Sequence, residues 1–274
     1  MPHNRQKKIA VINDFCGFGR CSLAVSLPII SALKVQCCPL PTAIFSNHTA
    51  FDSFYSTDFT PHMDAFIGEW AKLDLRFNGI LSGFLGSAEQ ISIVTRFLKQ
   101  FKSEETVTVV DPVMGDGGSL YRSFSPVLAG KMANLVPYAD ILTPNLTEAC
   151  ILTETPYDPD PGPKKLLELC SRLSEMGPEK IVISGLERGN FLENYVFVRG
   201  RAPEIVSVYK TGPCRAGTGD VFSSIVAADA VNGADFTESV SHAADFIAKA
   251  LKRTDELGLP KTDGICFEEI LKNI

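Results

Sequence analysis

The sequence of 274 residues has no long hydrophobic run. No stretch of about 18 consecutive apolar residues occurs, so a membrane-spanning helix is not expected. The apolar run Ile9–Ile12, which follows Lys7 and Lys8, is too short for the core of a signal peptide. We therefore expect a cytoplasmic protein without a membrane partner.

The sequence also lacks an excess of positive charge and the cysteine pairs of a zinc site. Its net charge is −6 and its pI is about 5.3, which argues against a nucleic-acid-binding surface. The eight cysteines show no C-x-x-C spacing, and a chain of this length does not need disulfides to fold. We expect reduced thiols, and we find no internal repeat and no low-complexity tract.

What the chain does contain is an alternation of short strands and helices joined by short loops. Residues 106–110 form the strongest strand pattern because they are rich in β-branched side chains, and residues 88–102 show helical spacing of apolar residues. Residues 79–82 and 180–184 are predicted as further short strands. The alternation predicts an α/β protein with a doubly wound, mostly parallel sheet and helices on both faces. Since it resumes directly after the proline-rich loop 157–163, we expect a single domain over residues 1–274.

Polar or glycine-rich loops follow five of the predicted strands. In parallel α/β sheets, ligands bind beyond the carboxyl ends of the strands. If these strands are parallel, their loops meet at one edge of the sheet and form a site. The residues at or directly after the carboxyl ends of these strands are Asn13, Asp111, Thr143, Ser184 and Tyr209.

Residues 211–220 form a glycine-punctuated loop that leads directly into an apolar helix. Glycines allow close approach of the backbone, and the N-terminus of a helix favours an anion. Asp220 stands on the first turn, beside Gly217 and Gly219. A carboxylate would repel a bound phosphate, so Asp220 fits better as a base for a hydroxyl about to be phosphorylated. The alternative is an early capping residue of an ordinary helix.

The segment after the first strand is similar to a dinucleotide-binding fingerprint, but only in part. Gly17 and Gly19 match the first two glycines, whereas Ser22 occupies the third position. No clear acidic residue closes a second strand in residues 35–43. Because an isolated G-x-G is weak evidence, we do not favour this interpretation.

Three other segments each allow a structural and a functional interpretation. Residues 43–51 are either a plain loop or the aromatic wall of a ligand pocket, in which His48 is a hydrogen-bonding scaffold residue. Residues 111–121 are either a turn or a metal–phosphate neighbourhood with Asp111 and Asp116. Asn145 and Glu148 match a variant of the capping box, which is sufficient by itself, or belong to the site.

Together these motifs resemble the ribokinase-like superfamily, and more narrowly its pyridoxal/pyridoxamine kinase branch. The resemblance rests on Gly217–Asp220, on Asp111–Asp116, on Thr143–Ala149 and, for the branch, on Phe45–Thr49. The four motifs occur in the right order over essentially the whole chain.

The resemblance implies transfer of the ATP γ-phosphate to the 5′-hydroxymethyl group of a B6 vitamer, a step of pyridoxal phosphate salvage. Asp220 would be the general base, and the amides of Gly217 and Gly219 would hold charge on the transferred phosphoryl group. The implied Mg²⁺ site consists of Asp116, Asn145 and Glu148, with Asp111 assisting from further away. The implied nucleotide-phosphate contacts are Asp116, Thr143, Ser184 and Thr218. The implied contacts to the pyridine ring are Asn13, Phe45, Thr49 and Phe84. The resemblance also implies a homodimer and allows a monovalent cation such as K⁺.

The sequence departs from the branch at two ring positions. Asn13-Asp14-Phe15 stands where better-known pyridoxal kinases carry Ser followed by a larger polar residue, and Phe84 stands where Tyr is expected. The preference among pyridoxal, pyridoxamine and pyridoxine is therefore open. The short loop at Asp116 predicts a small or absent lid.

Three alternatives remain. Several hydroxymethylpyrimidine kinases have Cys where Asp220 stands, which disfavours that activity without excluding it. A sugar kinase would show a longer lid insertion. A non-catalytic nucleotide- or vitamer-binding protein would not need Asp220, Asp116 and Glu148 together.

Overall fold

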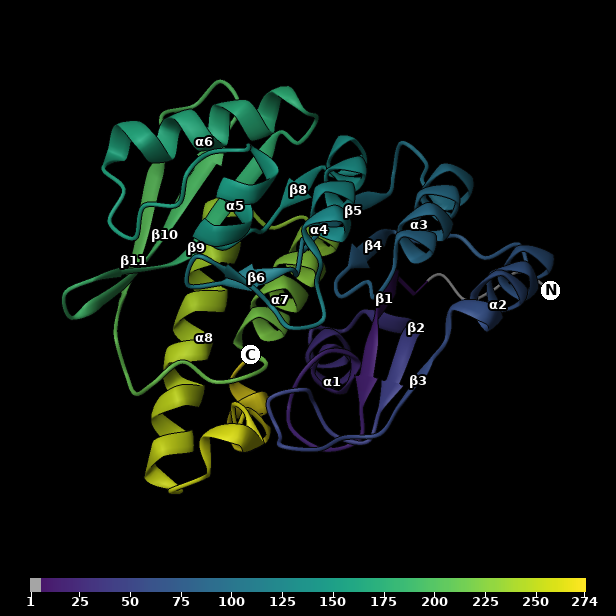
Figure 1. Ribbon diagram of the computed structural model, residues 1–274, viewed down its shortest axis with the longest axis horizontal. Coiled ribbons are helices and arrows are strands. Elements are labelled where there is room, and N and C mark those ends of the chain that lie inside the picture. The colour runs from purple at the N-terminus through teal and green to yellow at the C-terminus, as the bar shows by residue number, and fades with distance from the viewer. Residues whose placement is uncertain (1–5) are drawn as a thin grey trace.

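A computed structural model describes residues 6–274, and its centre is one nine-stranded sheet. The strands are β1 Lys8–Cys16, β2 Gln36–Phe45, β3 Ser56–Asp58, β4 Gly79–Ser82, β5 Val107–Val110, β8 Ile141–Leu142, β9 Lys180–Arg188, β10 Phe191–Val198 and β11 Glu204–Tyr209. Their order across the sheet is β11-β10-β9-β8-β5-β4-β1-β2-β3 (Figure 1). The six strands from β9 to β2 are parallel, and the flanking strands β10, β11 and β3 pair antiparallel.

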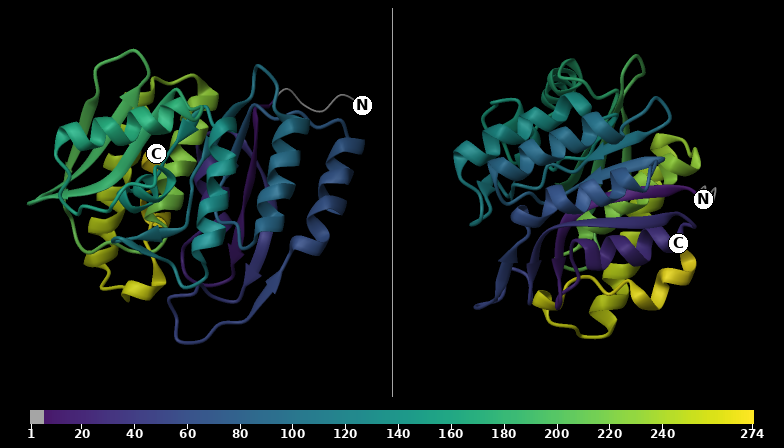
Figure 2. Two further views of the ribbon diagram at one scale, coloured as in Figure 1. Left: turned by 45° about the horizontal axis from the view of Figure 1, so that its top comes forward. Right: turned by 90° about the vertical axis from the view of Figure 1, so that its right-hand side faces the viewer.

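Helices cover both faces of this sheet (Figure 2). On one face lie α1 Leu23–Ala32, α7 Thr218–Asn232 and α8 Phe236–Glu256. On the other lie α2 Thr60–Lys72, α3 Ala88–Phe101, α4 Pro126–Met132, the 3₁₀ helix η1 Ala133–Tyr138, α5 Leu146–Leu152 and α6 Pro163–Glu175. The sheet therefore separates two hydrophobic cores.

Strand β1 shows how the sequence places this sheet between two cores. All four residues from Ile9 to Ile12 are fully buried. Because successive side chains point to opposite faces of a strand, Ile9 and Val11 join the core with α7, whereas Ala10 and Ile12 join the core with α3. A continuous apolar run is what a strand covered on both faces requires.

The predicted fold class is confirmed, and the differences are local. Strand β4 has the predicted bounds, whereas β9 continues to Arg188 and forms a hairpin with β10 that the sequence did not indicate. The short loop after β5 is itself a hairpin, β6 Gly115–Asp116 with β7 Ser119–Leu120, and its turn has Gly117 and Gly118 at positive φ. The chain ends in two 3₁₀ helices, η2 Lys261–Asp263 and η3 Glu268–Asn273. Among residues 6–274, no helix is long and apolar enough to cross a membrane.

Candidate active site

The carboxyl ends of the parallel strands meet at one edge of the sheet, and most of the candidate site residues lie there. Backbone hydrogen bonds join the strand ends: Gly83 N–H donates to Ile12, Asp111 N–H to Ser82, and Thr143 N–H to Val110. Asn145, just beyond β8, forms a further parallel bridge with Ser184 of β9. The convergence expected from the alternating pattern thus brings these loops side by side.

Helix α7 begins at this edge with an open N-terminus. Gly217 precedes it in the left-handed conformation (φ 87°), and no side chain caps the helix. A Cβ at Gly217 would lie 2.1 Å from the backbone oxygen of Arg20, so only glycine fits there. The first N–H groups of an uncapped helix are donors for an anion.

Asp220 lies half-buried on the first turn of α7. The Asn13 Nδ2 donates to Asp220 Oδ1 over 3.1 Å. Burial raises the pKa of the Asp220 carboxyl to about 6, and the nearby Asp14 charge adds to this, whereas hydrogen bonds from the Ser22 backbone and the Asn13 amide oppose it. A carboxylate that titrates near neutral pH and is oriented by donors suits a general base.

Asn13 is fixed by three hydrogen bonds. Besides the bond to Asp220, its Oδ1 accepts from the N–H groups of Asp14 and Phe84 at 3.0 and 2.9 Å. Gly83 leaves room for this amide, because a Cβ there would come within 2.6 Å of Asn13 Nδ2. One N–H of the amide is left for a ligand.

Helix α5 begins close by with a closed N-terminus. Asn145 Oδ1 accepts from Glu148 N–H at 3.0 Å, and Glu148 Oε2 accepts from Asn145 N–H at 2.9 Å, which completes the capping box. Glu148 Oε1 accepts from Met114 N–H at 3.1 Å, and Asn145 Nδ2 donates to the oxygen of Gly115 at 2.7 Å. The box thus also ties the loop after β5 to α5.

The carboxyl groups at this edge influence one another. Burial raises the pKa of Glu148 to about 8, although its backbone donors oppose the shift. Burial also raises the pKa of Asp111, and the charges of Glu148 and Asp220 raise it further. Two buried carboxyls with raised pKa values mark an environment that favours a cation.

Asp116 differs from these two because it is exposed. Its Oδ1 accepts from Gly117 N–H at 2.7 Å, which leaves the second oxygen available. In the described part of the chain, no three His, Cys, Asp or Glu side chains form a ready-made metal cluster. Carboxylate and amide oxygens such as those of Asp116 and Asn145 are of the donor type that Mg²⁺ takes from proteins.

The candidate nucleotide contacts have hydroxyl groups at the same edge. Thr143 is buried, and its Oγ1 has no hydrogen-bond partner. Ser184 and Thr218 are half-buried, and Thr218 Oγ1 donates to the oxygen of Arg215 at 3.2 Å. A buried hydroxyl without a partner is costly unless a ligand completes it.

Aromatic rings line the side of the site near β2 and β4. The rings of Phe45 and Phe84 are 6.3 Å apart, edge to face. Phe54 lies 5.8 Å from Phe45, and Phe124 lies 5.8 Å from Phe84. Phe54 and Phe124 were not predicted from the sequence, because both lie in irregular segments without periodicity.

The loop after β2 carries the remaining candidate, Thr49, in an exposed turn. The loop is held by His48, whose Nε2 lies 2.6 Å from the oxygen of Thr262 and whose Nδ1 accepts from Ala50 N–H. His48 is thus a hydrogen-bonding scaffold residue, as predicted.

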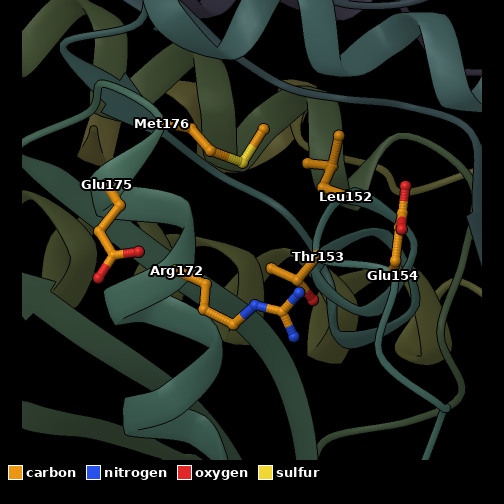
Figure 3. Close-up of a pocket in the computed structure, with 6 residues that line it drawn as sticks. All are labelled: Leu152, Thr153, Glu154, Arg172, Glu175 and Met176. Carbon is orange, nitrogen blue, oxygen red and sulfur yellow. The ribbon is translucent and has the colours of Figure 1, made fainter.

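A cavity of about 250 Å³ lies elsewhere, between the C-terminal ends of α5 and α6. Leu152, Thr153 and Glu154 line one side, and Arg172, Glu175 and Met176 the other (Figure 3). Arg172 donates to Thr155 Oγ1 at 2.9 Å. None of the candidate site residues lines this cavity.

Solved structures of other proteins share this fold. A family model described as phosphomethylpyrimidine kinase matches residues 27–264. The chain belongs to this family. The predicted resemblance to pyridoxal kinases of the ribokinase-like superfamily is also confirmed by curated relatives.

The relatives of this phosphomethylpyrimidine kinase family member include solved structures and curated pyridoxal kinases. A Bacteroides thetaiotaomicron protein assigned to the phosphomethylpyrimidine kinases is 36% identical, with a TM-score of 0.97 over 100% of this chain and 95% of that chain. A second crystal form of it, with pyridoxal, gives 36% identity, a TM-score of 0.95 and coverage of 98% and 96%. The pyridoxal kinase of Arabidopsis thaliana is 28% identical. The aligned region covers 69% of this chain and 62% of that relative's length. A pyridoxal kinase of Actinobacillus pleuropneumoniae is 25% identical, over 87% of this chain and 86% of its own.

Proposed function

We propose that the protein transfers the γ-phosphate of ATP to the 5′-hydroxymethyl group of a B6 vitamer. The observation that carries this proposal is Asp220, a half-buried carboxylate held by Asn13 at the uncapped N-terminus of α7. The Bacteroides relative with pyridoxal supports the choice of substrate class.

In this reaction Asp220 takes the proton from the substrate hydroxyl as that oxygen attacks the γ-phosphorus. The backbone amides of Gly217 and Gly219 hold the charge on the transferred phosphoryl group. Thr143, Ser184, Thr218 and Asp116 contact the nucleotide phosphates. Such positioning and charge stabilisation are the main contributions that a protein makes to phosphoryl transfer.

The pyridine ring lies against Phe45 and Phe84 in this proposal. Their edge-to-face pair offers one apolar wall. The free N–H of the Asn13 amide and the hydroxyl of Thr49 contact the polar edge of the ring. A largely apolar pocket with few polar groups is typical for small ring compounds.

Mg²⁺ would be held with its waters by Asp116, Asn145 and Glu148, with Asp111 behind them. When bound, the ion supplies positive charge to the phosphate oxygens. Glu148 and Asn145 also fix the loop that presents Asp116, since they hold the backbone of Met114 and Gly115.

The deciding experiment is ATP consumption with Mg²⁺ on a panel of pyridoxal, pyridoxamine, pyridoxine, hydroxymethylpyrimidine and ribose. Turnover confined to the three B6 compounds supports the proposal, and their ranking resolves the effect of Asn13 and Phe84. Turnover of hydroxymethylpyrimidine alone would support a second candidate function, which the description of the family model favours. Turnover of ribose alone would contradict both.

We further propose that the chain is a single domain that acts as a homodimer in the cytoplasm. One sheet carries the strands of both halves of the chain, which supports the single domain. Light scattering of the purified protein tests the dimer, since a mass near 29.8 kDa would contradict it.

A further inference from the structure

Ser22 has an unusual backbone conformation beside the proposed base. Its φ of 56° and ψ of −137° lie in a region typical of glycine at the first central position of a type II′ turn. A serine there is strained, and such strain persists only when the surroundings impose it. Ser22 is also buried, at the junction between the first loop and α1.

Several contacts impose this conformation. The Ser22 hydroxyl donates to Asp14 Oδ1 over 2.7 Å, and both residues are buried. The Ser22 carbonyl accepts from the N–H groups of Val25 and Ser26 at 3.0 Å each, and the backbone of Ser22 pairs with Phe15. The carbonyl and the side chain of Ser22 thus both have hydrogen-bond partners that hold the residue in this conformation.

The first loop reaches Asp220 through Asn13, whose Oδ1 accepts from Asp14 N–H over 3.0 Å. The same amide donates through its Nδ2 to Asp220 Oδ1 over 3.1 Å. Helix α1 is tied to α7 one turn further on, because Ser224 Oγ donates to Ser26 Oγ over 3.0 Å. The strained residue therefore lies where the first loop and the base helix are joined.

We infer that Asp14 and Ser22 are positioning residues for Asp220. The Asp14–Ser22 hydrogen bond fixes the first loop, in which the Asp14 N–H holds the Asn13 amide that orients the Asp220 carboxylate toward the substrate hydroxyl. This inference rests on the proposed role of Asp220 as the base. Neither Asp14 nor Ser22 is among the site residues predicted from the sequence.

The test compares Ser22→Ala with Ser22→Gly. Alanine removes the hydroxyl but keeps the Cβ that disfavours this conformation. The backbone therefore relaxes, and kcat falls about tenfold or more with little change in KM. Glycine removes the hydroxyl and the strain together, so the thermal midpoint stays at or above that of the wild type while kcat still falls severalfold. Loss of kcat in a variant that is not destabilised distinguishes positioning from a purely structural role.

A matched control lies beyond the other end of α1. Lys34 is exposed, has a positive φ of 64° and is far from Asp220 in the sequence. Lys34→Gly relieves the same kind of strain, so its thermal midpoint is expected to rise while kcat stays unchanged.

Substitutions of Asp14, which accepts the hydrogen bond from Ser22, provide a second test. Asp14→Asn keeps an oxygen that accepts from Ser22 and is expected to retain more kcat than Asp14→Ala. The double variant Ser22→Ala/Asp14→Ala should be no slower than the slower single variant, because both act through one contact. Independent, multiplicative losses would overturn the inference, as would a Ser22→Ala kcat within twofold of the wild type or a loss confined to KM.

The wild-type protein separates this inference from the proposed function. Its turnover on the substrate panel decides which compound is phosphorylated. The ratios of variant to wild-type kcat, taken on whichever compound is turned over, decide the role of Asp14 and Ser22.

Discussion

Helices α5 and α7 begin at the same edge of the sheet, but their N-termini are built in opposite ways. Helix α5 has a complete capping box in which Asn145 and Glu148 hold each other's backbone N–H groups. Helix α7 follows a left-handed glycine and has no side-chain cap. The capped end can hold a loop in place, whereas the open end can offer its N–H groups to an anion. We therefore propose that the end of α7 binds the transferred phosphoryl group, whereas the end of α5 fixes the loop after β5.

The strongest test of this comparison is Asp220→Asn on the open helix. We expect turnover to fall by about 10²- to 10⁴-fold, because the amide cannot accept the hydroxyl proton, while ATP binding persists. Rates are measured with saturating pyridoxal, and ATP binding is measured by calorimetry. The matched control is Asp245→Asn on the exposed side of α8, which should leave both unchanged. Near-normal turnover of Asp220→Asn would remove the assigned base.

A comparison of Gly217→Ala with Gly219→Ala tests why the N-terminus of α7 needs glycine. At Gly217 the added Cβ meets the Arg20 backbone and the conformation is left-handed, whereas at Gly219 nothing lies within 4 Å. We expect Gly217→Ala to cost at least about 1–2 kcal/mol of unfolding free energy and to lower turnover about tenfold or more. Gly219→Ala should keep the wild-type thermal midpoint. Equal stability of the two variants would contradict the left-handed start of α7.

The pH dependence of kcat/KM reports the state of the base. The pKa of Asp220 is raised to about 6, so the protonated, inactive carboxyl accumulates below that pH. We expect kcat/KM to fall about tenfold per pH unit below pH 6 and to level off above it. If kcat/KM falls at the same pH for pyridoxine and pyridoxamine, the group that titrates belongs to the enzyme. If that pH changes with the vitamer, the group belongs to the substrate.

The smallest expected effect concerns the capped helix. Asn145→Ala removes the acceptor for Glu148 N–H and should lower the unfolding free energy by about 1 kcal/mol, read from urea denaturation. Asn145→Asp can still cap α5 and should lose less. If Asn145→Ala is as stable as the wild type, the capping box does not hold the end of α5.

The sequence was sufficient where structure follows from local contacts. The bounds of β4 and the capping box at Asn145 could be predicted because apolar pattern and cap spacing act within a few residues. Two features could not. The strained conformation of Ser22 depends on its hydrogen bond to Asp14, and the bond from Asn13 to Asp220 joins residues 207 positions apart. No periodicity records contacts of this kind.

The ring contacts were only partly predictable for the same reason. Phe45 and Phe84 follow predicted strands, so their position at the edge could be inferred. Phe54 reaches Phe45 only because the loop after β2 folds back through the antiparallel strand β3. That loop is held by His48 and Thr262, which are 214 positions apart.

The strand order has a consequence for how the chain is completed during synthesis. The sheet grows outward from β1, and each later strand can add to an edge that already exists. One face receives α2 to α6 as the chain emerges, but the opposite face has only α1 until residues 218–256 are made. A nascent chain that stops before α7 would expose apolar strand residues such as Val109 and Val182 on that face. The segment that carries the proposed base is thus also the one that covers the second core, so a partly synthesised chain would be both inactive and prone to aggregate.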